Sequence, residues 1–260
     1  MRLSAILFSQ GFGTRRECVG RVLDGQVVIT GRVCDDPDED FATDGLMFSV
    51  DGREWPFHEK ALVVLHKPAH YECSMKPRHH PSVMSLLPAP LRTRGLQPVG
   101  RLDEDTTGLL LLTDDGALIH RLTSPKKHMP KVYEVTTRHP VDERQLTALR
   151  THVVLDDDPA PVAALDAQAT GEHTLRMTLT EGRYHQVKRM VAAVGNRVDA
   201  LHRSAIGAYV LPKDLSPGQW CWLDPAALYA TQRLADAAPQ ERAPVPRPTT
   251  SPSEPSEPSR

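Results

Sequence analysis

One stretch constrains the fold more than any other part of the chain, because it joins a polar loop to a continuous apolar run. Residues 100–116 read GRLDEDTTGLLLLTDDG. Consecutive leucines bounded by turn-forming residues are typical of a buried strand. The aspartate that precedes them, Asp103, should therefore lie in a loop anchored to a rigid core element. Loops fixed in this way hold reactive side chains in a defined geometry.

The local pattern around Asp103 allows two interpretations. The first is a structural loop whose acids cap Thr106 or Thr107, the usual role of an isolated aspartate beside threonines. The second is a phosphatase-like Asp-x-Asp-x-Thr signature formed by Asp103, Asp105 and Thr107, in which the first acid attacks phosphate and Mg²⁺ bridges the acids. That signature normally ends a buried strand. Here the apolar run follows the aspartate, which disfavours a phosphotransferase.

A third interpretation comes from a longer match. The pattern at 100–116 resembles the catalytic motif of bacterial rRNA pseudouridine synthases of the RsuA family. GRYHQVKRM at 182–190, and LTSP with the basic run that follows it at 122–131, are most similar to the small-subunit branch of that family. The resemblance implies a stand-alone enzyme that isomerises a uridine of 16S rRNA, uridine 516, without metal, nucleotide or redox cofactor. A large-subunit 23S rRNA enzyme of the same family and a non-catalytic rRNA-binding assembly factor remain alternatives.

The resemblance assigns three catalytic side chains. Asp103 corresponds to the family's catalytic aspartate and is expected to act as a nucleophile. Tyr133 is expected to stack on the uracil and to take part in proton transfer, although a tyrosine on a strand is often only a core residue. Lys188 is expected to pair with Asp103. The helical phase favours it over Arg189, because Lys188 flanks the apolar stripe that begins at Val187, whereas Arg189 should point toward solvent or RNA.

Basic residues gather where an RNA substrate would bind. Residues 181–213 are rich in lysine and arginine, whereas acids concentrate at 35–59 and 154–172. A basic cleft in a chain of net charge -2 is enough to bind phosphates. Together with the resemblance, which places Leu201 beneath the uracil, these observations predict the following substrate- or RNA-binding residues: Arg101, Thr107, Lys126, Lys127, Lys131, Arg183, His185, Gln186, Arg189, Leu201, Arg203, Arg15, Arg16 and Arg21.

The chain is predicted to be an α+β protein with two folded units. Residues 1–50 resemble an S4 RNA-binding domain, and within them the strongly acidic segment 35–44 should form an outward-facing loop. Residues 51–60 are predicted to be a linker. The resemblance places a pseudouridine synthase catalytic domain, with a central mixed and mostly antiparallel sheet, at 61–232. Residues 233–260 are rich in proline and serine, so they are predicted to form a disordered tail.

Two kinds of local signal complete the prediction. Thr14 and Glu17 form a capping box, which begins a helix whose apolar arc ends at Leu23. Residues 70–98 and 155–171 lack a clear period and are predicted to be largely irregular connections.

The cysteine content and the apolar runs of the chain indicate which cofactors and which cellular compartment to expect. The four cysteines are far apart, which argues against a zinc site or a disulfide framework and fits a reducing cytosol. His79 and His80 suggest a metal site, but no acid or cysteine lies near them at ligand spacing, so no metal is predicted. No run approaches the roughly 20 apolar residues of a membrane span. We therefore expect a cytoplasmic monomer whose partner is rRNA or a pre-ribosomal particle, with no membrane contact and no nucleotide cofactor.

Overall fold

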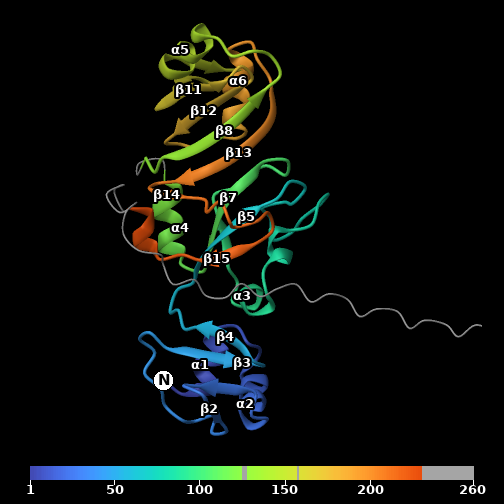
Figure 1. Ribbon diagram of the computed structural model, residues 1–260, viewed down its shortest axis with the longest axis vertical. Helices are drawn as coiled ribbons and strands as arrows, with labels where there is room; N and C mark the ends of the chain where they lie inside the picture. Colours follow the sequence, from blue (N-terminus) through green and yellow to red (C-terminus); the bar gives the residue numbers. More distant parts are fainter. Residues whose placement is uncertain (125–127, 157, 230–260) are drawn as a thin grey trace, which may run out of the picture.

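The computed structural model describes residues 1–124, 128–156 and 158–229, so the predicted tail at 233–260 lies outside the described residues. Two parts follow one another along the long axis in Figure 1, a small N-terminal unit and a larger body built on one sheet. Among the described residues, none of the helices combines the length and the apolar composition that a bilayer crossing requires.

The N-terminal unit packs two helices against a small antiparallel sheet. Leu3, Ile6 and Leu7 recur at helical spacing, and all three are buried. The predicted capping box of Thr14 and Glu17 is confirmed: each residue's side chain bonds to the other's backbone N–H. The strand order is β2-β1-β3-β4. The elements are α1 (Leu3–Ser9), α2 (Arg15–Leu23), β1 (Val27–Ile29), β2 (Arg32–Cys34), β3 (Met47–Val50) and β4 (Arg53–Pro56).

Two sequence predictions for this unit are wrong. Leu23, the last residue of α2, is exposed, whereas Val22 directly before it is buried, so the apolar arc that faces the core ends one residue earlier. Residues 53–56, predicted to be part of a linker, form β4. Trp55 on that strand is buried, and its ring lies edge-on to Phe12 and Trp222, with both centroid distances 5.4 Å. Its burial joins the N-terminal unit to the body.

A nine-stranded sheet forms the body, with the main order β11-β12-β8-β13-β7-β5-β15. The prediction of a mixed, mostly antiparallel sheet is confirmed, since β7 and β13 form the parallel pair. Two further strands, β14 and β6, pair with β13 and β7. The strands are β5 (Leu62–Lys67), β6 (Gln97–Val99), β7 (Thr107–Thr113), β8 (Lys131–Thr137), β11 (Asp166–Gly171), β12 (Thr174–Leu179), β13 (Val198–Ile206), β14 (Tyr209–Val210) and β15 (Trp220–Trp222).

Short helices and one small ribbon surround this sheet. The predictions of largely irregular connections fail in part: residues 70–98 contain η1, α3 and β6, and residues 155–171 contain β10 and β11. These elements are short, so they leave little periodic signal. They are η1 (Val83–Leu86), α3 (Ala89–Thr93), α4 (Gly116–Thr123), α5 (Glu143–Thr151), α6 (Gln186–Ala193), η3 (Pro225–Leu228) and the two-stranded ribbon of β9 (Val153–Leu155) and β10 (Asp158–Val162).

The leucine run explains the position of the candidate site. All four leucines of β7 are buried, and they alternate between two apolar clusters: Leu110 and Leu112 lie in one, Leu109 and Leu111 in the other. A strand covered on both faces reads as a continuous apolar run rather than an alternating one. The polar loop before β7 is therefore attached to the centre of the core.

Arg94 links the N-terminal unit to the body through a mostly buried network. Its side chain is 5% exposed and forms an ion pair with Asp114. It also donates to Gln10 Oε1 at 2.6 Å and to the backbone carbonyls of His58 and Glu59 at 2.6 and 2.8 Å. Charged groups removed from water are stable only when they are fully paired.

We expect Arg94→Met to lower the free energy of unfolding by about 3 kcal/mol, because the change leaves Asp114 without its cation in a mostly buried position. For a chain of this size the melting temperature should fall by roughly 6–12 °C. Arg92→Met, on the exposed side of the same helix, is the matched control and should change stability by less than about 0.5 kcal/mol. Equal losses in the two variants, measured by urea denaturation, would contradict the structural role of Arg94.

Candidate active site

A buried lysine holds the loop that carries Asp103. The loop lies between β6 and β7, and the Thr106 N–H donates to the Asp103 carbonyl at 3.1 Å. Lys67 is fully buried at the end of β5, and its Nζ donates to the backbone carbonyls of Glu104 and Thr106 at 2.9 and 2.8 Å. Burial lowers the pKa of Lys67. Lys67 is not among the residues predicted for the site, and its position at the end of a buried strand was the available signal for this anchoring role.

One ammonium group pairs with two carboxylates at this loop. Lys188 Nζ lies 3.1 Å from Asp103 Oδ2, and 2.7 and 2.9 Å from the two carboxylate oxygens of Asp105. The helix α6 buries Val187 and Val191, which turns Lys188 along the edge of the core toward the loop, as the helical phase predicted. The side chains of Asp103 and Lys188 are 27% and 26% exposed, so a substrate can still reach them.

The charges in this cluster stabilise one another. Partial burial acts to raise the pKa of Asp105, but the hydrogen bond and charge of Lys188 outweigh it, and the pKa lies below its ordinary value. Burial acts to lower the pKa of Lys188, and its hydrogen bonds to Asp105 and Asp103 more than compensate, so that pKa is raised. Asp105 was considered from sequence only as a metal ligand. The structure instead makes it the second partner of Lys188.

His185 and Tyr184 form an aromatic pair beside Asp103. His185 Nε2 lies 3.2 Å from Asp103 Oδ1. Its backbone has a φ of 47°, a left-handed conformation that is uncommon outside glycine and that turns the chain sharply into α6. The Tyr184 ring stacks on the imidazole, with centroids 3.8 Å apart, and Tyr184 is 68% exposed. Sequence reasoning missed Tyr184, although an aromatic residue within a basic motif was the available signal.

Tyr133 lies on β8, in a row of residues that crosses the sheet toward the catalytic loop. It pairs with Arg203 on β13, and Arg203 pairs with Gly108 on β7. Since Gly108 lies at the start of β7, this row places Tyr133 near the end of the sheet from which the Asp103 loop projects. Its ring is mostly buried. Its role in stacking and proton transfer stays a prediction.

Three of the residues predicted to contact RNA form hydrogen bonds within the protein instead. Arg203 is 2% exposed and donates to the Leu109 carbonyl at 2.8 Å, so it supports the sheet from within. Gln186 is buried and donates to Glu181 Oε1 at 2.7 Å. Arg189 does not point freely to solvent, because its guanidinium donates to the Tyr184 carbonyl at 3.1 Å. The partner of Arg203 is distant in the sequence, whereas the partners of Gln186 and Arg189 lie five residues before them.

The other residues predicted near the substrate remain predictions. Arg101 is exposed beside the catalytic loop. Thr107 Oγ1 contacts His202 Nδ1 at 2.9 Å, and Leu201 is buried on β13. Lys131 donates to the Met129 carbonyl at 3.0 Å, and burial lowers its pKa to about 8. Arg183 lies 3.5 Å from the Glu181 carboxylate, which reduces its availability to phosphates.

The remaining basic residues divide into two groups. Lys126 and Lys127 lie outside the described residues. On α2, Arg15 and Arg16 are exposed, and the Arg15 guanidinium lies 4.3 Å from the centre of the Phe8 ring. Arg21 forms an ion pair with Asp51 of the same unit at 3.0 Å, so its guanidinium is less available to RNA phosphates.

Gly108 lets β7 and β13 approach each other directly behind the catalytic loop. Its φ is +105°, and a Cβ built there would lie 2.3 Å from the Arg203 carbonyl oxygen. We expect Gly108→Ala to cost about 2–5 kcal/mol of stability, combining backbone strain with overpacking, and to displace the Asp103 loop. Urea denaturation together with an assay of the enzyme's reaction measures both effects.

Gly116→Ala is the matched control for this change. Gly116 opens α4, has no positive φ, and meets nothing within 4 Å of an added Cβ. Alanine there should be neutral or slightly stabilising, since it is the better helix former. A Gly108→Ala protein as stable as Gly116→Ala would contradict the close approach of β7 and β13.

The geometry disfavours the phosphotransferase interpretation. A bridging Mg²⁺ would need the oxygens of Asp103 and Asp105 together. Lys188 Nζ already lies within 3.1 Å of both carboxylates and supplies the positive charge that the ion would provide. The arrangement instead presents one carboxylate, held by an ammonium and an imidazole, in a partly open position at the end of a core strand.

A partly exposed carboxylate held by a lysine on a mixed sheet is the arrangement of an enzyme site, and comparison with known proteins gives the class of enzyme. The family model described as RNA pseudouridylate synthase matches residues 61–193. The chain therefore belongs to the RNA pseudouridylate synthase family, whose members are isomerases.

Its relatives include the ribosomal small subunit pseudouridine synthase A of Yersinia pestis, which is 40% identical over 229 residues, covering 85% of this chain and 93% of that protein. The protein of the same name from Escherichia coli (strain K12) is 37% identical over 227 residues, covering 85% and 95%. A crystal structure of a pseudouridylate synthase superimposes with a TM-score of 0.62 and 33% identity over 88% of this chain and 98% of that one.

Proposed function

We propose that this chain converts one uridine of rRNA to pseudouridine, that the target is uridine 516 of small-subunit 16S rRNA, and that Asp103 is the nucleophile. The observation that supports it most is the contact between Asp103 and Lys188 at 3.1 Å, which keeps a partly exposed carboxylate next to a cation. The relatives reported above are named for the small ribosomal subunit and match most of this chain. No cofactor is needed for the reaction.

The chemistry exchanges one bond of the nucleoside for another. The bond between ribose and the uracil nitrogen breaks, the base turns, and a carbon of the base rejoins the ribose while its proton is lost and the nitrogen gains one. The target must first leave its stack, which costs a few kcal/mol. Asp103 serves as the nucleophile, Lys188 keeps it ionised and oriented, and Tyr133 stacks on the extruded base and assists proton transfer.

The RNA is held by surfaces on both parts of the molecule. We assign the N-terminal unit as an S4-like RNA-binding domain, with Arg15 and Arg16 exposed on α2. The acidic segment 35–44 is compatible with this role, because Asp38 and Glu39 form ion pairs with arginines of the same unit. Near the catalytic loop, the exposed ring of Tyr184 can stack on an unpaired base, as aromatic side chains do in single-stranded RNA recognition. The protein acts as a monomer on rRNA or a pre-ribosomal particle.

Mapping pseudouridines in 16S and 23S rRNA tests this function. Cells that lack the protein should lose the modification at uridine 516 and no other. Wild-type protein should restore it, and Asp103→Asn should not. Loss of a 23S site would instead identify a large-subunit enzyme. If Asp103→Asn restored the modification, or if none were lost, a non-catalytic assembly factor would be the better description.

A further inference from the structure

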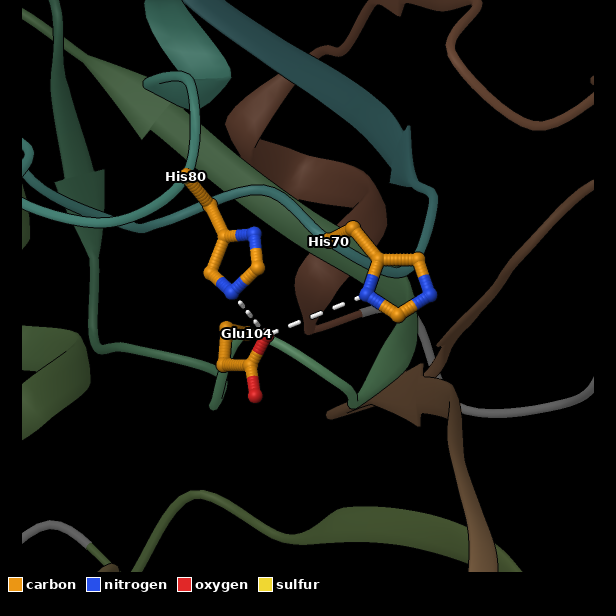
Figure 2. Close-up of side chains that lie close together, drawn as sticks. All are labelled: His70, His80 and Glu104. Atoms are coloured by element: carbon orange, nitrogen blue, oxygen red, sulfur yellow. Dashed lines mark ion pairs between the residues drawn. The ribbon is translucent and has the colours of Figure 1, made fainter.

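Two histidines and a glutamate of the catalytic loop lie close together (Figure 2). His80 Nε2 lies 2.9 Å from Glu104 Oε2, and His70 Nδ1 lies 3.9 Å from the same oxygen. One ligand atom from each of the three side chains lies within 4.8 Å of the others. In the sequence, no acid lies at metal-ligand spacing from His80. The fold supplies one from a different segment, the residue directly after Asp103.

The backbones that carry these side chains are already fixed. The His70 N–H donates to the Glu104 carbonyl at 2.8 Å, and Lys67 Nζ donates to the same carbonyl at 2.9 Å. The Glu72 carboxylate accepts from the backbone N–H groups of residues 78–80 at 2.7–3.2 Å, which shapes the turn that presents His80. Binding of an ion would therefore require only small side-chain rotations, so little ordering cost opposes it.

The donor set and its spacing suit a transition-metal ion. Bonds of about 2.0–2.1 Å in a tetrahedral zinc site place neighbouring ligand atoms about 3.3 Å apart. The two contacts of Glu104, at 2.9 and 3.9 Å, bracket that spacing. Two imidazole nitrogens and one carboxylate oxygen favour Zn²⁺ and similar ions, whereas Mg²⁺ and Ca²⁺ prefer oxygen ligands throughout. The side chains are at least one-third exposed, which leaves an entry path and room for water as a fourth ligand.

We propose that His70, His80 and Glu104 bind a divalent transition-metal ion of the zinc class, with water in the fourth position. This site lies beyond the proposed RNA reaction and uses none of the side chains that contact Asp103. The bound ion joins the segment 70–80 to the loop 103–106 by a coordinate link, in addition to the hydrogen bonds that already connect them.

Calorimetric titration of the full-length protein with Zn²⁺ tests the site. We expect one Zn²⁺ per chain, and an affinity that falls at least about 10-fold in His80→Ala and in Glu104→Gln, since even outer-shell partners of metal ligands are worth 10–100-fold. His79→Ala removes a neighbouring exposed histidine outside the cluster and should bind Zn²⁺ as the wild type does. Mg²⁺ should bind far more weakly. Circular dichroism confirms that each variant is folded.

Co²⁺ provides an independent readout of the ligands. The wild type should give the visible absorption of a tetrahedral or five-coordinate Co²⁺ site, and Glu104→Gln should lose it. A strong thiolate-to-cobalt band would point to the nearby Cys73 as a ligand and overturn the assignment. It would equally be overturned if His79→Ala weakened Zn²⁺ binding as much as His80→Ala, or if Glu104→Gln left the affinity unchanged.

Discussion

Asp103→Asn should reduce the rate of pseudouridine formation by at least about 1000-fold, the scale seen when an enzyme loses its nucleophile. The amide has nearly the same shape but cannot attack as a carboxylate does. Stability should change little, because the partly exposed ion pair with Lys188 contributes about 1 kcal/mol or less and Asp105 still holds the lysine. Tritium release from labelled uridine in rRNA measures the rate, and thermal melting measures stability.

Asp105→Asn is the informative comparison, because Asp105 binds the same ammonium at a shorter distance. If Asp103 is the nucleophile, Asp105→Asn should retain activity within about tenfold of the wild type, because an exposed ion pair contributes about 1 kcal/mol or less. A reversed pattern, with Asp105→Asn inactive and Asp103→Asn active, would transfer the catalytic role to Asp105. Similar tritium release from wild type and Asp103→Asn would end the assignment of a catalytic carboxylate to this loop position.

The elements that the sequence predicted well are those governed by local rules. The capping box at Thr14 and Glu17 depends on residues three apart, and the buried stripe of α6 depends on helical period. The pairing of Lys188 with Asp103 combined that helical phase with the family resemblance, and the structure places the two groups 3.1 Å apart. Local periodicity thus gave the direction of the side chain, and the resemblance gave its partner.

Several of the errors have a different cause, which is contact with segments far away along the chain. Arg203 looks like any basic residue in a positively charged stretch, yet its side chain is buried and donates to the Leu109 carbonyl on the neighbouring strand β7. Trp55 lies in a polar segment, and only the packing of Phe12 and Trp222 makes β4 part of the core. Glu104 meets His80 for the same reason. Sequence spacing carries no information on such contacts, since the partners are 24 or more residues apart along the chain.

The second large effect is expected at Lys188. Lys188→Met should lower kcat/KM by at least about 100-fold, because the variant keeps most of the unbranched side chain but leaves Asp103 and Asp105 facing each other without a cation. Lys188→Arg should restore much of the activity, since a guanidinium can bridge the same carboxylates. The pKa of Lys188 is raised, so the lysine is fully charged at pH values below the ordinary pKa of lysine and loses its charge only as pH rises through the raised value. The lysine itself therefore adds no titration near neutral pH.

Arg189→Met separates a specific role of Lys188 from the loss of one positive charge on α6. Both variants remove one charge from adjacent positions, but Arg189 is directed to the Tyr184 carbonyl rather than to the catalytic carboxylate. We expect Arg189→Met to lower kcat/KM by less than about tenfold, mainly through KM, whereas Lys188→Met should act mainly on kcat. Single-turnover rates at saturating rRNA distinguish the two. Equal losses of kcat would mean that α6 contributes only positive charge to RNA binding. The contact between Lys188 and Asp103 would then not contribute to the catalytic rate.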